Sequence, residues 1–186
     1  MLTLLDPNTA LVIIDLQNGI VAMPTIHPVA DVVSRSRALA EAFRARGLPV
    51  VLVNVAGIAP GRTERPRTGG PFPDGWTDIV PELAPQPGDI ILTKQTWGAF
   101  ASTDLEQRLK ASGVTQVVIT GVATATGVES TARQAYEAGF NVTLAIDAMT
   151  DSRAEAHDYS IAKVFPRLGE TGTTQDIINL LEQRSA

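Results

Sequence analysis

Short, almost unbroken apolar runs alternate with longer amphipathic stretches along most of this chain. Continuous runs of this kind predict strands that are buried on both faces, as in a parallel sheet covered by helices. The expected strands lie near 10–15, 49–54, 89–93, 116–120 and 141–146, with a short sixth strand at 168–171. The expected helices lie near 29–46, 102–112, 127–138, 152–164 and 173–184.

Three glycines support this order of elements. Gly47, Gly113 and Gly139 each close an amphipathic stretch a few residues before a predicted strand. A glycine in this place takes the left-handed conformation that ends many helices. The pattern therefore predicts one domain over residues 1–186 with a three-layer α/β/α architecture, in which a mainly parallel, six-stranded, Rossmann-like sheet lies between helices.

The segment 56–87 breaks the alternation, because it holds seven of the twelve prolines and five glycines without sustained periodicity. A loop of this length in a compact domain usually serves as a lid or as a subunit contact. Its Arg62, Arg65 and Arg67 could attract a carboxylate substrate. Arginines that merely solvate an exposed loop are the simpler interpretation.

Composition narrows the classes of function. A net charge of −5 and an isoelectric point near 5.0 give no reason to expect nucleic acid or an anionic membrane as partner. The absence of cysteine excludes disulfides, thiolate metal sites and thiol catalysis. The N-terminus lacks the features of a signal peptide and no apolar run approaches a membrane-spanning length, so we expect a cytoplasmic protein.

Two ionisable residues follow apolar strands. Asp15 ends the first predicted strand and Lys94 ends the third. The carboxyl ends of parallel strands meet at the edge where α/β proteins bind ligands, so we expect the two side chains to face each other and to favour each other's charged form. Each also has a plainer interpretation: Asp15 as a turn residue with Gln17 and Asn18, and Lys94 as a surface lysine.

A third candidate lies where the strand near 116–120 gives way to a helix. The small residues of 121–127 (GVATATG) let backbone N–H groups approach a ligand oxygen closely. Thr126 could instead cap the following helix. Glu129 and Arg133, four residues apart, fit a surface ion pair of that helix.

In order and spacing these pieces resemble the isochorismatase-like hydrolases, also called the cysteine hydrolase superfamily. The matching motifs are LVIIDLQN at 11–18, Lys94 with GAF at 98–100 and STDL at 102–105, VITGVAT at 118–124, GVESTARQA at 127–135, and Asp147-Ala148. The resemblance extends over essentially the whole chain. It implies an aspartate at 15, a lysine at 94, a cysteine at 127 and a cis peptide near Val122–Ala123.

Gly127 stands where the resemblance implies the nucleophilic cysteine, so thioester chemistry and amidase activity are not expected. True isochorismatases, which this arrangement resembles, cleave a vinyl ether with an aspartate as general acid and have small residues in place of the thiol. We therefore predict a hydrolase of a small metabolite that uses Asp15 and Lys94 for acid–base chemistry. Asp15 must be protonated for this; Lys94 opposes protonation and desolvation favours it.

The resemblance and the expected sheet edge together define a pocket. Asp15, Lys94 and the backbone of 123–127 are expected to line it, under a partial cover of Trp97, Phe100 and segment 56–87. The substrate contacts that we expect are Gln17, Trp97, Phe100, Val122, Ala123 and Thr126. No cofactor is expected, and no metal, because His27 and His157 are the only histidines and segment 53–57 lacks the Asp-x-His pattern of nicotinamidases.

Two alternatives remain open. Thr126 or Ser130 could act as the nucleophile if a base activated the hydroxyl, or the chain could be an inactive pseudoenzyme that only binds a small molecule. The presence of both Asp15 and Lys94 speaks against the pseudoenzyme, since a buried charge pair is costly to retain for structure alone. The resemblance also implies a homo-oligomer, either a dimer or a tetramer.

Overall fold

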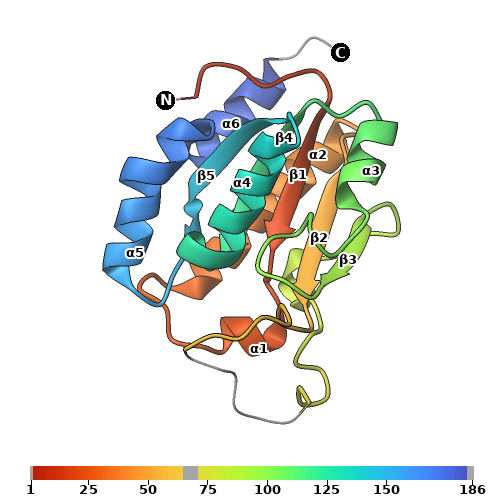
Figure 1. The fold of residues 1–186 in the computed structure, drawn as a ribbon. Helices are drawn as coiled ribbons and strands as arrows, with labels where there is room; N and C mark the ends of the chain where they lie inside the picture. The colour runs from red at the N-terminus through yellow and green to blue at the C-terminus, as the bar shows by residue number, and fades with distance from the viewer. Residues whose placement is uncertain (1, 65–70, 184–186) are drawn as a thin grey trace.

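Six parallel strands form one sheet in the computed structural model, which describes residues 2–64 and 71–183 (Figure 1). The order of strands in the sheet is β3-β2-β1-β4-β5-β6. The chain thus builds outward from β1 to one edge and then from β4 to the other. The strands are β1 (Thr9–Ile14), β2 (Val50–Val55), β3 (Ile90–Lys94), β4 (Gln116–Val122), β5 (Asn141–Thr150) and β6 (Glu170–Gly172).

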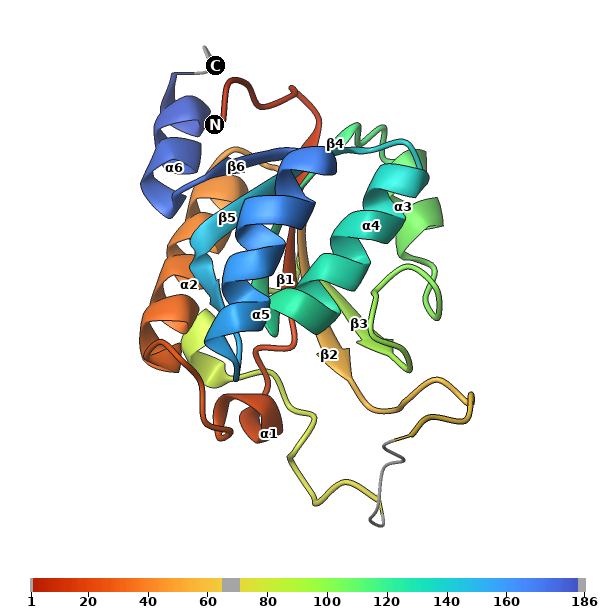
Figure 2. The same cartoon turned by 60° about the vertical axis from the view of Figure 1, so that its left-hand side comes forward.

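Helices cover both faces of the sheet, which confirms the predicted three-layer architecture (Figure 2). The helices are α1 (Asn18–Val21), α2 (Val29–Ala45), α3 (Leu105–Ala111), α4 (Glu129–Glu137), α5 (Ala154–Tyr159) and α6 (Thr174–Glu182). Short 3₁₀ turns lie at Pro81–Leu83 and Phe165–Arg167, and π-helical turns lie at Thr124–Val128 and Ser160–Val164.

Alternate residues of the central strand β1 point into opposite layers, as strand geometry requires. Val12 and Ile14 pack in the core beneath α3 and α4, whereas Leu11 and Ile13 pack in the core beneath α2 and α6. All four side chains are essentially inaccessible to solvent. Burial on both faces explains why the strand consists of an unbroken apolar run.

The element boundaries differ from the predicted ones in several places. β5 continues to Thr150, and its pairing with β4 shifts register between Ile119 and Gly121. The third helix begins at Leu105, because the Thr103 hydroxyl accepts a hydrogen bond from the Leu105 N–H and holds the preceding residues in a turn. α1 has only four residues, which is too short to give a periodic pattern.

The last described part of segment 56–87 contacts the residues that join β1 to α1. Gln17 and Ile79 form an isolated antiparallel bridge, and the Val80 N–H donates to the Leu16 carbonyl. Arg62 is exposed, while Arg65 and Arg67 lie outside the described residues. Among the residues that the structure describes, no helix is long and apolar enough to cross a membrane.

Candidate active site

Asp15 and Lys94 form a buried ion pair at the carboxyl edge of the sheet. The Lys94 ammonium donates to Asp15 Oδ2 at 2.7 Å and to the Thr96 carbonyl at 3.2 Å. Only 1% of the lysine side chain and 8% of the aspartate side chain is exposed. Asp15 directly follows β1 and has a backbone φ of 53°, in the left-handed region.

The second carboxylate oxygen, Asp15 Oδ1, is buried and has no hydrogen-bond partner among the residues that the structure describes. Burial raises the pKa of Asp15 from 3.8 to about 6, although the neighbouring Lys94 lowers it. Desolvation therefore outweighs the attraction of the lysine. Because the ammonium binds Oδ2, a proton taken up near pH 6 is expected on Oδ1.

Gly127 faces this ion pair from the turn that follows β4. The Val122–Ala123 peptide bond is cis, and the chain then enters the π-helical turn Thr124–Val128. A Cβ added to Gly127 would lie 3.2 Å from Asp15 Oδ2 and 3.0 Å from Ile14 Cγ2. The glycine does not have a positive φ. A side chain at this position would therefore start beside the carboxylate.

Asp15, Lys94 and Gly127 open into one pocket of about 280 Å³. Among the described residues, the ion pair and Thr126 form its polar lining, and Val55, Ile58, Phe72, Trp76 and Trp97 form its apolar walls. Trp97 itself is 64% exposed, so it lies at the mouth of the pocket. The pocket can surround a small molecule with apolar contacts and present it to one carboxyl group and one ammonium group.

Four of the expected substrate contacts are not among the described residues that line this pocket. Phe100 does not reach the pocket: its ring packs 5.8 Å from that of Phe140, and its N–H donates to the Gln134 side chain. Val122 is buried and Ala123 half-buried in the chain just before the turn. The fourth, Gln17, is entirely buried.

Thr126 lines the pocket but does not cap a helix. The residue in the N-cap position, just before the π-helical turn, is Ala123, and the structure shows no side-chain cap there. Thr126 lies inside the turn, where its N–H donates to the Ala123 carbonyl. The predicted surface pair of the next helix does form, with Arg133 Nη2 3.0 Å from Glu129 Oε1.

Phe72 and Trp76 belong to segment 56–87, which was expected to cover the pocket, but the sequence pattern singled out neither residue. Their rings stack with centroids 4.1 Å apart and an angle of 18° between planes. Both come from a Pro- and Gly-rich stretch, PFPDGW at 71–76, that carries no helix or strand periodicity. Two large aromatic residues in this Pro- and Gly-rich stretch were the available signal, since such residues rarely remain fully exposed.

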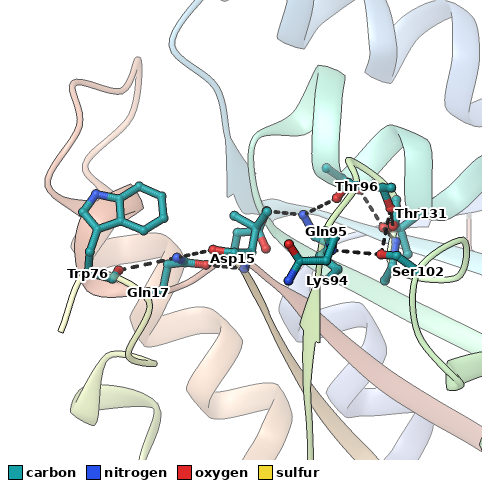
Figure 3. Close-up of polar contacts among 12 residues, drawn as sticks. Asp15, Gln17, Trp76, Lys94, Gln95, Thr96, Ser102 and Thr131 are labelled. Carbon is teal, nitrogen blue, oxygen red and sulfur yellow. Dashed lines mark hydrogen bonds and ion pairs between the residues drawn. The ribbon is translucent and has the colours of Figure 1, made fainter. Parts of the chain in front are cut away.

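Hydrogen bonds join the loop after Lys94 to the turn that carries Gly127 (Figure 3). The Thr96 hydroxyl binds Ser102 Oγ at 3.0 Å, and the same Ser102 oxygen accepts from the Gln95 N–H. From α4, the Thr131 hydroxyl accepts from the Ala99 N–H and donates to the Gly127 carbonyl at 2.7 Å. The two sides of the pocket are thus one connected unit.

The structure brings the two histidines together behind this turn. The rings of His27 and His157 meet edge to face, 4.9 Å apart. His157 Nδ1 lies 2.8 Å from the hydroxyl of Thr124, the first residue of the turn, and His27 Nδ1 lies 3.2 Å from the Thr150 hydroxyl. Within the described chain, no three His, Asp or Glu side chains are grouped so as to hold a metal ion.

This contact predicts how stability depends on pH. Burial, followed by the neighbouring His27, lowers the pKa of His157 below 6.5. The unfolded chain therefore binds this proton more readily, so the contribution of His157 to stability is present above about pH 6.5 and lost as the pH falls through the folded-state pKa. Urea unfolding from pH 7.5 to 5.5 should show the native chain losing stability relative to His157→Gln. Asp15 titrates in both proteins, so its effect cancels; parallel curves would contradict the prediction.

The sheet order and the pocket define the class of protein. Strand order reverses between β1 and β4, and the residues that follow these two strands, Asp15 and Gly127, face each other across that point. Doubly wound α/β proteins bind their ligands at such a point. The isochorismatase domain matches residues 9–176, and the chain belongs to the isochorismatase family of hydrolases.

Known relatives agree with this assignment. The chain is 39% identical to the uncharacterized isochorismatase family protein YecD of Escherichia coli O157:H7, over 97% of this chain and all of YecD. The structure of an isochorismatase family protein from Burkholderia thailandensis is similar with a TM-score of 0.93 and 41% identity, over 97% of this chain and 98% of that one. The isochorismatase of Bacillus subtilis is 28% identical over 97% of this chain, which spans 61% of that protein.

Proposed function

We propose that this protein hydrolyses a small metabolite by acid–base chemistry of Asp15, without a covalent cysteine intermediate. The observation that carries the proposal is the free, buried Oδ1 of Asp15 beside a pocket, with a pKa of about 6. A carboxyl group with such a pKa is protonated in an appreciable fraction of molecules near neutral pH and is then a strong enough acid to donate. Gly127 has no side chain, which leaves room for a substrate beside the Asp15 carboxyl group.

Lys94 is suited to support the charge that this chemistry creates. When Asp15 gives up its proton from Oδ1, the resulting carboxylate is stabilised by the ammonium 2.7 Å from Oδ2. For an enol ether, the proton goes to carbon and water adds to the oxocarbenium carbon that forms. That water returns a proton to Asp15, and the hemiketal breaks down to a ketone and an alcohol. The acid is thereby regenerated.

A panel of hydrolase substrates tests the proposal. The Bacillus relative makes isochorismate the first compound to try, with pyruvate release as the readout; a simple amide and a ureido acid serve as comparisons. We expect cleavage of the enol ether and no cleavage of the amides. Binding of these compounds without hydrolysis of any would favour the pseudoenzyme instead.

Thr126 supplies the alternative nucleophile, because this residue lines the same pocket. Among the described residues, however, no histidine or carboxylate is hydrogen-bonded to its hydroxyl, so no base is in place to activate it. Thr126→Val separates the two mechanisms, since it removes the hydroxyl and retains the shape. If turnover is lost and the native enzyme forms a covalent ester on mixing with substrate, Thr126 is the nucleophile.

The pH dependence of turnover gives a second test. A general acid acts in its protonated form, and protonated Asp15 predominates below about pH 6. The value of kcat/KM should therefore fall by about tenfold for each pH unit well above this pKa. Rates measured in overlapping buffers from about pH 5 to 8.5, with unfolding checked at each pH, give the profile. A rate that rises across this range would make Asp15 a base.

A further inference from the structure

The chain just after Asp15 is tied to the pocket segment that carries Trp76. The Gly19 N–H donates to the Trp76 carbonyl at 2.9 Å, and the Asn18 N–H donates to the Asp78 carbonyl at 2.9 Å. The Asn18 side chain adds a hydrogen bond to the Gly75 carbonyl at 3.1 Å. Three hydrogen bonds thus hold 75–78 against the first turn of α1.

Gly19 also makes room for the indole itself. A Cβ added there would overlap three ring atoms of Trp76, Cδ1, Nε1 and Cε2. Neither helix α1 nor the backbone angle accounts for this glycine, because alanine is the better helix former and Gly19 does not have a positive φ. The structure offers one explanation for this glycine: it leaves the space that the Trp76 indole fills, which we call the Trp76 seat.

Gln17 connects the same segment to β2. Its Nε2 donates to the Val55 carbonyl at 3.0 Å and to the Trp76 carbonyl at 3.4 Å, and its Oε1 accepts from the Val55 N–H at 2.7 Å. The side chain is fully buried. Both residues that it holds, Val55 and Trp76, line the pocket. Figure 3 shows the contact between Gln17 and Trp76.

We propose that Gly19 and Gln17 are positioning residues, which hold Trp76 as a wall of the Asp15 pocket before any ligand binds. The inference deepens the proposed function, on which its catalytic consequence rests. Gln17 and Gly19 then do more than carry the chain away from Asp15. They also hold the wall of the pocket that Trp76 forms. Such preorganisation reduces the cost of ordering the site on binding.

A double-mutant cycle tests the seat without any substrate. In the native chain, Gly19→Ala should lower the midpoint of urea unfolding, because the new methyl group displaces the indole. In a Trp76→Ala chain the same change should raise the midpoint, because only the better helix propensity of alanine remains. Gly88→Ala is the matched control, since a Cβ at Gly88 would meet nothing within 4 Å. An effect of the same sign in both backgrounds would contradict the proposal that Gly19 makes room for Trp76.

Fluorescence follows the indole directly. The chain has two tryptophans, so Trp97→Phe leaves Trp76 as the single emitter. In that background Gly19→Ala and Gln17→Leu should each shift the emission to longer wavelength and increase quenching by acrylamide, while far-UV circular dichroism stays unchanged. Emission and quenching equal to those of the Gly88→Ala control would show that neither residue positions Trp76.

Kinetics on a substrate cleaved in the hydrolase panel then separate the two proposals. Loss of the wall should raise KM several-fold for Gly19→Ala with kcat retained, because the change removes binding and leaves Asp15 in place. A displaced indole with unchanged KM would overturn the role of Trp76 as a ligand wall. If no panel compound is cleaved, the proposed function fails. The double-mutant cycle and the fluorescence still show whether Gly19 and Gln17 position Trp76.

Discussion

Asp15→Asn is expected to abolish turnover while the protein remains folded. The substitution removes the proton that Oδ1 would carry and keeps the side-chain shape, and asparagine tolerates the left-handed backbone at this position. Its amide oxygen can still accept the Lys94 hydrogen bond. General acid–base groups contribute about 10²–10⁴-fold to rate, so initial rates should fall by that factor.

The control for this variant is Asp31→Asn, which makes the same chemical change at an exposed position of α2. Both proteins should show native circular dichroism. Initial rates within a factor of two or so of the native enzyme in Asp15→Asn would place the chemistry on another residue, since so small a loss is far below the contribution of a general acid.

Gly127→Cys should create a reactive thiol. The new Cβ would lie 3.2 Å from Asp15 Oδ2, close to the Lys94 ammonium that binds the same oxygen. A nearby cation lowers the pKa of a thiol, and Asp15 can accept its proton. We expect alkylation by iodoacetamide at pH 7 to be about tenfold faster than for an ordinary exposed cysteine, the gain in thiolate that a pKa near 7 provides.

The chain offers clean controls, because it has no cysteine of its own. Iodoacetamide should leave the native protein and its activity unchanged. Gly88→Cys supplies the ordinary exposed thiol, and Lys94→Met added to Gly127→Cys should remove most of the enhancement, because the cation that stabilises the thiolate is then gone. A folded Gly127→Cys that reacts no faster than Gly88→Cys would mean that position 127 is not the nucleophile position of the family.

The pattern of apolar runs was sufficient to predict the sheet, because each central strand is buried on both faces. β1 and β4 are buried at every position, and both were predicted within two residues of their ends. The extension of β5 to Thr150 was not predictable, since its last residues include Asp147 and follow a shift in pairing with β4. The register in which two strands pair produces no periodic pattern in a single sequence, so it cannot be predicted from that sequence alone.

The ion pair was predicted from the positions of Asp15 and Lys94 at strand ends, where topology alone decides which residues meet. The placement of Phe100 was not, because a residue six positions beyond a strand can turn back into the helical layer, as this one does against Phe140. The two histidines are 130 positions apart, and only the fold brings them together. Trp76 likewise depends on a contact with α1.

The left-handed backbone at Asp15 bears on how this site can change in evolution. With φ at 53°, the position suits aspartate, asparagine or glycine and disfavours β-branched residues, whatever the chemistry requires. A single base change in an aspartate codon can give asparagine or glycine, so loss of the acid need not cost the fold. Descendants that abandon catalysis should therefore keep the backbone and carry one of these two residues, whereas valine at this position would add about 1–2 kcal/mol of backbone strain.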